Sequence, residues 1–265
     1  MDLGIKDRVA LITGADGGMG FATAKVLAAE GAKLVLTDRA RGAWEAEASG
    51  LGTDVATIAA DVTRQEEVDA VAKAALERFG RIDIVVHTAG ITGAKGDPLD
   101  MTDADYEEAW RTDFLSAVHV ARATFPAMRR GGWGRFVCIA SENAVQPYWE
   151  EATYNAAKAA LAAFVKNLSY REAEHGILCN TVSPAFIATD MTDEMMKKRA
   201  AENGTSFDEA VESFLKEERP GIVLKRRGRA EEVAAVIALL VSERGSFVNG
   251  SNVRVDGGSV QSVQS

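Results

Sequence analysis

The sequence has 265 residues, a length typical of one large α/β domain or two small ones. Hydrophobic residues make up 47% of it and charged residues 26%, an ordinary globular composition with enough apolar material for a core. The formal net charge of −9 argues against a nucleic-acid or anionic-membrane partner, because binding to phosphates requires a basic surface.

No run of the sequence approaches the roughly 20 apolar residues that cross a bilayer. The N-terminus also lacks the apolar core and small-residue cleavage site of a secretion signal. Cys138 and Cys179 each lie in an apolar run, and the three histidines are scattered. We therefore expect a cytoplasmic protein with buried, unreactive thiols and no metal site.

Short apolar runs alternate with helical patterns along nearly the whole chain. The apolar runs predict strands at 8–13, 33–37, 55–60, 82–87, 135–140, 177–182 and 252–256. Helical periodicity occurs between them, at 18–30, 65–79, 103–128, 153–174 and 230–241. Several strands are apolar on consecutive residues, as expected when both faces of a sheet are covered. The order predicts one Rossmann-type domain, a doubly wound parallel sheet of about seven strands with helices on both faces.

One segment does not fit this alternation. Residues 190–228 are charged and helical where a short turn from strand to helix would suffice. Long insertions of this kind usually have a function, so we expect a helical lid over the substrate.

A glycine-rich turn follows the first predicted strand. It reads TGADGGMG at 13–20 and places Gly14, Gly18 and Gly20 in the pattern T-G-x-x-x-G-x-G. Glycine lets a backbone turn sharply and approach a pyrophosphate, which then lies on a helix N-terminus. Such turns also occur for structural reasons alone, but the position between a strand and a helix favours a dinucleotide site.

Two carboxylates end neighbouring strands. Asp38 could accept hydrogen bonds from the adenosine ribose and repel a 2′-phosphate, which favours NAD over NADP, whereas the adjacent Arg39 could pair with that phosphate. Asp38 could also be a simple turn residue. Asp61 could reach the adenine amino group or cap the helix that begins near Thr63.

Taken together, the motifs resemble the short-chain dehydrogenase/reductase family over essentially the whole chain. The matching segments are TGADGGMG at 13–20, DV at 61–62, HTAG at 87–90, Ser141, YNAAK at 154–158, SPAFIAT at 183–189 and DGG at 256–258. The resemblance implies a Rossmann-type enzyme that moves hydride between a nicotinamide and an alcohol or ketone.

The resemblance also assigns the chemistry to three residues. Tyr154 and Lys158 are four apart and share one helix face, so the ammonium can lower the pKa of the phenol and make it a usable acid/base. Ser141, at the end of a strand, is positioned to hold the substrate oxygen. The cofactor site is expected at Gly14, Asp16, Gly17, Gly18, Met19, Gly20, Asp38, Arg39, Asp61, Val62, Thr88, Ala89, Gly90, Tyr154, Lys158, Pro184, Ala185, Ile187 and Thr189.

Three positions depart from the family pattern. Asp113 stands where the family usually has a catalytic asparagine, in a register supported by Pro126, where the family's helix commonly ends. We expect Asp113 to keep a water-mediated relay but to raise the operating pH of Tyr154. Thr88 replaces an asparagine of the NNAG signature, and Ala185 replaces the glycine of the usual PG pair.

The substrate is not identified by these motifs. Candidate contacts are Glu142, Asn143, Trp149, Phe186, Met191 and Met195, of which the methionines could equally pack against the body or a neighbouring subunit. The favoured function is oxidation or reduction of a hydrophobic or cyclic secondary alcohol or ketone with NAD. The alternatives are an NADPH-dependent 3-ketoacyl reductase and a catalytically inactive dinucleotide sensor. The resemblance also suggests a homotetramer.

Overall fold

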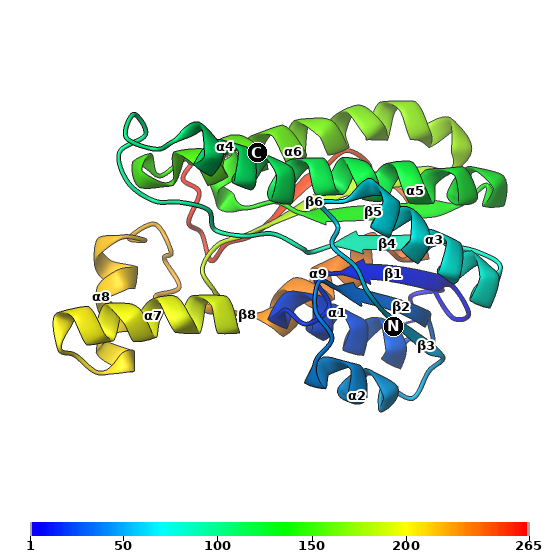
Figure 1. Ribbon diagram of the computed structural model, residues 1–265, viewed down its shortest axis with the longest axis horizontal. Helices are drawn as coiled ribbons and strands as arrows, with labels where there is room; N and C mark the ends of the chain where they lie inside the picture. The colour runs from blue at the N-terminus through cyan, green and yellow to red at the C-terminus, as the bar shows by residue number, and fades with distance from the viewer. Residues whose placement is uncertain (1, 264–265) are drawn as a thin grey trace.

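Seven apolar segments form a single parallel sheet in the order β3-β2-β1-β4-β5-β6-β9 (Figure 1). The computed structural model describes residues 2–263. The strands are β1 (Val9–Thr13), β2 (Lys33–Asp38), β3 (Val55–Ala59), β4 (Ile84–His87), β5 (Gly134–Ile139), β6 (Ile177–Pro184) and β9 (Asn252–Val255). All seven predicted strands are confirmed, and their ends agree with the prediction to within two residues. β1, β4 and β5 are buried along their whole length, which explains their unbroken apolar sequences.

Helices cover both faces of this sheet (Figure 1). One face carries α1 (Gly18–Ala29), α2 (Ala43–Ser49) and α9 (Ala230–Leu240). The other carries α3 (Gln65–Phe79), α4 (Asp103–Trp110), α5 (Ser116–Gly131) and α6 (Ala152–Glu172). Helix α2 was not predicted, because seven residues are too few to show a helical period.

The predicted helix at 103–128 is interrupted. Between α4 and α5 the chain forms one π-helical turn, η1 (Arg111–Leu115), and Asp113 lies at its centre. Pro126, where the family's helix commonly ends, lies inside α5 in this chain. That helix continues to Gly131 and ends at Gly132, whose left-handed φ of 63° forms the cap.

The insertion, residues 190–228, contains α7 (Asp190–Asn203) and α8 (Phe207–Glu217). The two helices project to one side of the sheet (Figure 1). Two short strands, β7 (Ile187–Ala188) and β8 (Gly228–Arg229), pair where the insertion leaves and rejoins the body. A small core joins the insertion to the end of the body and contains Phe186, Met196, Phe214, Leu215 and Ile222.

The strand order fixes where a ligand can bind. The chain runs outward from β1 through β2 to β3, then returns to start again at β4 on the other side of β1. Ligands of open α/β sheets bind at such a reversal, beyond the carboxyl ends of the strands. The glycine turn, Asp38, Asp61 and Ser141 all follow strands at that edge.

Candidate active site

The turn between β1 and α1 has no room for side chains at two of its glycines. Gly14 has a left-handed φ of 66°, and a Cβ on it would lie 2.7 Å from the backbone nitrogen of Ala89. A Cβ on Gly20 would lie 2.2 Å from the carbonyl oxygen of Gly14. The residue that caps α1, Gly17, offers no side-chain bond to the first turn, so the amides there are available to an anion. The turn therefore fits the pyrophosphate of a dinucleotide.

Asp38 is held in place by backbone amides. Its two carboxylate oxygens accept hydrogen bonds from the amides of Arg39, at 2.7 Å, and Asp16, at 3.0 Å. The pKa of Asp16 is raised by burial and then by the negative charges of Asp38, Asp190 and Glu47. This end of the site is consequently acidic.

Asp61 accepts hydrogen bonds from both the amide and the hydroxyl of Thr63, at 2.9 and 2.7 Å. Burial raises the pKa of Asp61, but these bonds and the charge of Arg39 outweigh it, so the pKa is lowered. The proposed helix cap at Asp61 is wrong, since Arg64 occupies the N-cap position of α3.

These elements surround a cavity of about 600 Å³. Of the predicted cofactor residues it is lined by Gly14, Gly17, Gly18, Met19, Gly20, Asp38, Arg39, Asp61, Val62, Thr88, Ala89, Gly90 and Thr189. Asp16 reaches this site only through its bond to Asp38. Ala185 and Ile187 line a separate cavity of about 260 Å³. Pro184 is the last residue of β6, next to that pair.

Several residues of the cavity were missed from the sequence. They are Ala60, Thr63, Ile91, Ala104, Glu107, Glu108, Arg111, Thr112 and Asp190. Five of them lie on α4 and the π-helical turn, where they read as an ordinary solvated face. In the sequence, only the position of Arg111 and Thr112 next to Asp113 indicates that they could belong to the site.

Tyr154 and Lys158 lie on the first turns of α6, with Ser141 beyond the end of β5. The Lys158 ammonium lies 5.5 Å from the centroid of the Tyr154 ring. It also donates a hydrogen bond of 3.0 Å to the carbonyl of Ile139, the last residue of β5. The structure thus brings together the three residues predicted to carry the chemistry.

Asp113 forms an ion pair with Lys158, the carboxylate Oδ1 lying 3.2 Å from the ammonium. The same oxygen accepts a hydrogen bond of 3.1 Å from the amide of Ile91, while Oδ2 is buried without a partner. The π-helical turn sets the direction of this side chain, a use typical of such turns at functional sites. Gly90 makes room for the pair, because a Cβ there would lie 2.5 Å from Oδ1.

The charges of this group act on one another. Burial raises the pKa of Asp113 despite the attraction of Lys158. Burial alone would lower the pKa of Lys158, but Asp113 and Tyr154 outweigh it, so the pKa is raised. Burial also raises the pKa of Tyr154; Lys158 opposes that shift and Asp113 adds to it. The positive charge of Lys158, which favours the Tyr154 phenolate, therefore also interacts with the Asp113 carboxylate.

Ser141 belongs to a hydrogen-bonded chain. Its hydroxyl donates to the Asn143 amide oxygen at 2.9 Å and accepts from the Asn143 backbone amide at 3.2 Å. The Ser141 hydroxyl also acts on Tyr154, where hydrogen bonding lowers the pKa of the phenol. The serine is thus close enough to the phenol for both to contact one oxygen atom of a ligand.

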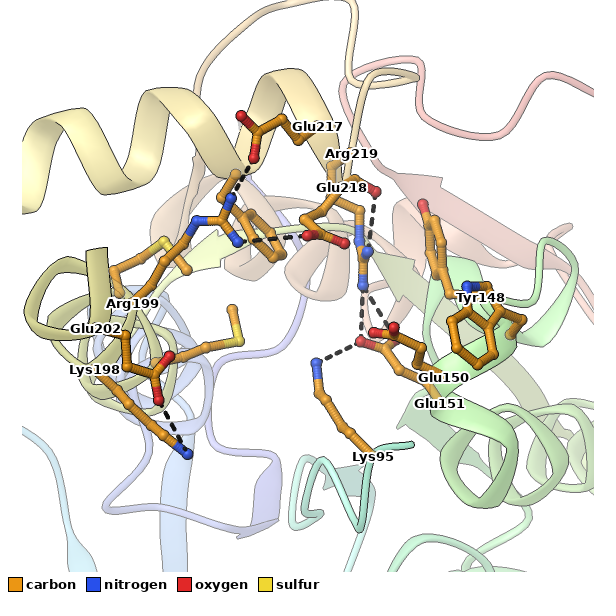
Figure 2. A pocket seen from close by; sticks show the side chains of 14 residues that line it. Lys95, Tyr148, Glu150, Glu151, Lys198, Arg199, Glu202, Glu217, Glu218 and Arg219 are labelled. Atoms are coloured by element: carbon orange, nitrogen blue, oxygen red, sulfur yellow. Dashed lines mark hydrogen bonds and ion pairs between the residues drawn. The ribbon is translucent and has the colours of Figure 1, made fainter. Parts of the chain in front are cut away.

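The six candidate substrate residues do not share one pocket. Glu142 is buried beside Arg219, with 3.5 Å between Oε1 and Nε. Trp149 and Met195 line a cleft of about 520 Å³ between the insertion and the body, seen in Figure 2. Met191 lines the cofactor cavity. Phe186 packs on Phe214, their ring centroids 4.7 Å apart. Asn143 contacts Ser141 and Glu151.

The described residues, 2–263, hold no group of three or more His, Cys, Asp or Glu side chains that could bind a metal ion. Nor does that part of the chain contain a helix long and apolar enough to cross a membrane. The site combines a glycine turn that fits a dinucleotide with one phenol, one ammonium and one hydroxyl. Such a set can move a proton at an oxygen while hydride moves at the adjoining carbon.

Comparisons with known proteins agree with this chemistry. A family model described as enoyl-(acyl carrier protein) reductase matches residues 14–260. Levodione reductase from Leifsonia aquatica is 35% identical over 257 residues, which cover 95% of this chain and 94% of that protein. The 3-oxoacyl-(acyl-carrier-protein) reductase FabG of Vibrio cholerae is 31% identical over 256 residues, covering 97% of this chain and 98% of the relative.

Solved structures give the same result. The structure of L-sorbose reductase from Gluconobacter frateurii, complexed with NADPH and L-sorbose, has a TM-score of 0.92 and 35% identity. The match spans 99% of this chain and 100% of the L-sorbose reductase chain. The structure of levodione reductase has a TM-score of 0.88 with 34% identity, over 96% of this chain and 98% of its own. This chain belongs to the short-chain dehydrogenase/reductase family and is an NAD(P)-dependent oxidoreductase.

Proposed function

We propose that the protein interconverts a hydrophobic or cyclic secondary alcohol and its ketone, with NAD as the preferred cofactor. One observation supports the chemistry above the others: Tyr154 and Lys158 share a face of α6 next to Ser141, beyond the carboxyl ends of the strands. The cavity lined by the glycine turn extends to Gly90, next to Lys158, and can take the dinucleotide.

In oxidation, Ser141 holds the alcohol oxygen and the Tyr154 phenolate takes its proton as the adjacent carbon loses hydride. When bound, the nicotinamide supplies the hydride acceptor, and its positive charge favours the phenolate. In reduction, Tyr154 returns the proton to the oxygen of the ketone. Lys158 opposes the rise in the pKa of Tyr154 that burial causes, and Asp113 holds that ammonium in place. The test is Tyr154→Phe, in which we expect kcat to fall at least about 1000-fold while the cofactor still binds.

The result of this test separates the enzyme from a dinucleotide sensor. Loss of turnover with retained binding supports Tyr154 as the acid/base. Unchanged turnover would remove the tyrosine from the mechanism. The sensor interpretation is disfavoured because the relatives found are reductases and the three reacting residues are present.

The preference for NAD rests on charge. Asp38 is fixed by two amides, one of them from Asp16, whose own carboxylate is close to the negative charges of Asp190 and Glu47. A 2′-phosphate would meet these carboxylates, although Arg39 offers it a partner and the sorbose reductase structure contains NADPH.

For Asp38→Asn we expect the ratio of kcat/KM for NAD to that for NADP to fall at least about tenfold, since a repulsive charge is removed. The measurement is initial-rate kinetics with both cofactors. Asp7→Asn, which changes the net charge equally at an exposed site outside the cavity, is the control. An unchanged ratio in Asp38→Asn would show that Asp38 does not select the cofactor.

The substrate class is supported by resemblance to levodione reductase and by apolar side chains near the site, including Met191 and Met195. The second candidate is an NADPH-dependent 3-ketoacyl reductase, favoured by the similarity to FabG. A panel of cyclic, aromatic and acyl alcohols and ketones, assayed with NAD(H) and NADP(H), separates the two. Highest kcat/KM for an acyl substrate with NADPH would overturn the first proposal.

We also propose a homotetramer, as the family resemblance suggests. Light scattering should then give about four times the 28.2 kDa mass of one chain. The cytoplasmic location expected from the sequence stays a prediction.

A further inference from the structure

An arginine of the insertion reaches across to the body of the protein. Arg219 follows α8, is only 9% exposed, and donates from Nη2 to both carboxylate oxygens of Glu151, at 2.9 and 3.1 Å. Its guanidinium stacks on the Tyr148 ring, 3.6 Å from the centroid. Figure 2 shows it spanning the cleft between α8 and the start of α6.

Glu151 continues this contact toward the reacting residues. Its Oε2 accepts a hydrogen bond of 2.7 Å from the Asn143 side-chain amide, whose nitrogen also donates to Asn155 at 2.8 Å. The opposite end of that amide, Oδ1, accepts from the Ser141 hydroxyl at 2.9 Å. Turning the amide over would place its NH₂ group against Ser141 and its oxygen against a carboxylate. Glu151 therefore fixes which end of Asn143 faces the serine.

The negative charge of Glu151 determines the direction of the hydrogen bonds that run through Asn143 to Ser141. Burial raises the pKa of Glu151, but Arg219 and Lys95 outweigh it, and the pKa is lowered. Lys95 lies 2.5 Å from Oε1, yet it is much more exposed than Arg219. Arg219 is thus the buried partner of the carboxylate, and the only one of the two that comes from the insertion.

We propose that Arg219 is a positioning residue: it closes the insertion on the body and, through Glu151 and Asn143, directs the hydroxyl of Ser141. This rests on the proposed role of Ser141 in holding the substrate oxygen. The same contact that covers the cleft then also completes the hydrogen bonding of the serine. Turnover would be coupled to closure of the insertion.

The chain offers a matched control in Arg199. This arginine also lies on the insertion, but its ion pairs, 2.6 Å to Glu217 and 3.4 Å to Glu218, join α7 to the end of α8 and do not reach the body (Figure 2). Arg199→Gln removes a guanidinium from the insertion without touching Glu151. Arg219→Lys keeps the charge at 219 but loses the planar fork.

The experiment is a double-mutant cycle on kcat between Arg219→Gln and Asn143→Ala. We expect Arg219→Gln to lower kcat about tenfold in the wild-type background and less than about twofold in Asn143→Ala, because the path to Ser141 is then already broken. Arg219→Lys should recover part of the loss, and Arg199→Gln should leave kcat within about twofold of wild type.

Hydrogen exchange gives a readout that does not need activity. In Arg219→Gln we expect faster exchange both in residues 141–151 and in the insertion, and in Arg199→Gln only in the insertion. An equal loss of kcat in both backgrounds, or a rise in KM alone, would mean that Arg219 only holds the insertion closed, and the proposal would fall. Failure of Tyr154→Phe to lose turnover would instead refute the proposed function, so the two failures are distinct.

Discussion

The acid/base role proposed for Tyr154 needs more than the chemistry of a free phenol. A phenol with a pKa near 10 is a poor base at neutral pH, and burial raises the pKa of Tyr154 further. Lys158 opposes that shift, but its ammonium is also paired with Asp113 at 3.2 Å. An asparagine at 113 would keep a polar group there without competing for the positive charge.

We therefore expect Asp113→Asn to move the rising limb of the pH–rate profile for alcohol oxidation to lower pH. The reason is that removal of the carboxylate charge lowers the pKa of Tyr154. The measurement is kcat/KM against pH for both proteins. Asp103→Asn, an exposed change at the start of α4, should leave the limb in place. If the rising limb of Asp113→Asn lies at the same pH as that of the wild type, the Asp113 carboxylate does not affect the pKa of Tyr154.

At the scale of elements, the turn from β1 to α1 depends on missing Cβ atoms. The sequence pattern predicted this turn correctly, because its glycines lie where an apolar strand is followed by a helix. The π-helical turn at 111–115 could not be predicted in the same way. Its residues are compatible with an α-helix, and the contacts of Asp113 with Lys158 and Ile91 that accompany the turn come from distant parts of the chain.

Gly20→Ala should weaken cofactor binding at least about 100-fold, because its Cβ would lie 2.2 Å from the Gly14 carbonyl oxygen and push the turn outward. We also expect a loss of about 1–3 kcal/mol in the free energy of unfolding. Titration of NADH fluorescence and chemical denaturation measure the two effects. Gly131→Ala, at a helical position with open space around it, should bind the cofactor normally and gain up to about 1 kcal/mol.

At the scale of the whole molecule, buried polar groups join the layers. His87, at the end of β4, hydrogen-bonds Thr13 of β1 at 2.8 Å and Ser116 of α5 at 3.0 Å. Burial and then the charge of Lys158 lower the pKa of His87 to about 3. The folded protein thus keeps this imidazole neutral where the unfolded chain would protonate it.

Because the pKa of His87 is lowered on folding, the unfolded state binds more protons below about pH 6.5 and stability falls as the pH drops toward about 3. The contribution of His87 is about 2 kcal/mol between pH 7 and pH 5. In His87→Asn this part of the slope should vanish, whatever the stability of the variant at pH 7. Urea denaturation at the two pH values is the measurement. If the wild type and His87→Asn lose the same free energy of unfolding between the two pH values, His87 is not the source of the pH dependence.

The separation of contacting residues along the chain explains which parts of the site could be predicted from the sequence. Tyr154 and Lys158 are neighbours on one helix and Ser141 lies just beyond the preceding strand, so their order along the sequence was enough for the family resemblance to point to them. Arg219 contacts Glu151 across 68 positions of the chain, and no periodicity carries that information. The candidate substrate residues were grouped by proximity in sequence, but the fold distributes them among different cavities.

Gly90 has a consequence for anyone screening random variants of this enzyme. Its backbone does not need a left-handed φ, so an alanine there would look harmless on conformational grounds. The added methyl group would nonetheless lie only 2.5 Å from Asp113 Oδ1 and 3.2 Å from the Lys158 ammonium. An inactive Gly90→Ala clone would thus resemble a cofactor-binding defect, although the damage lies in a displaced acid on a helix more than 20 positions away.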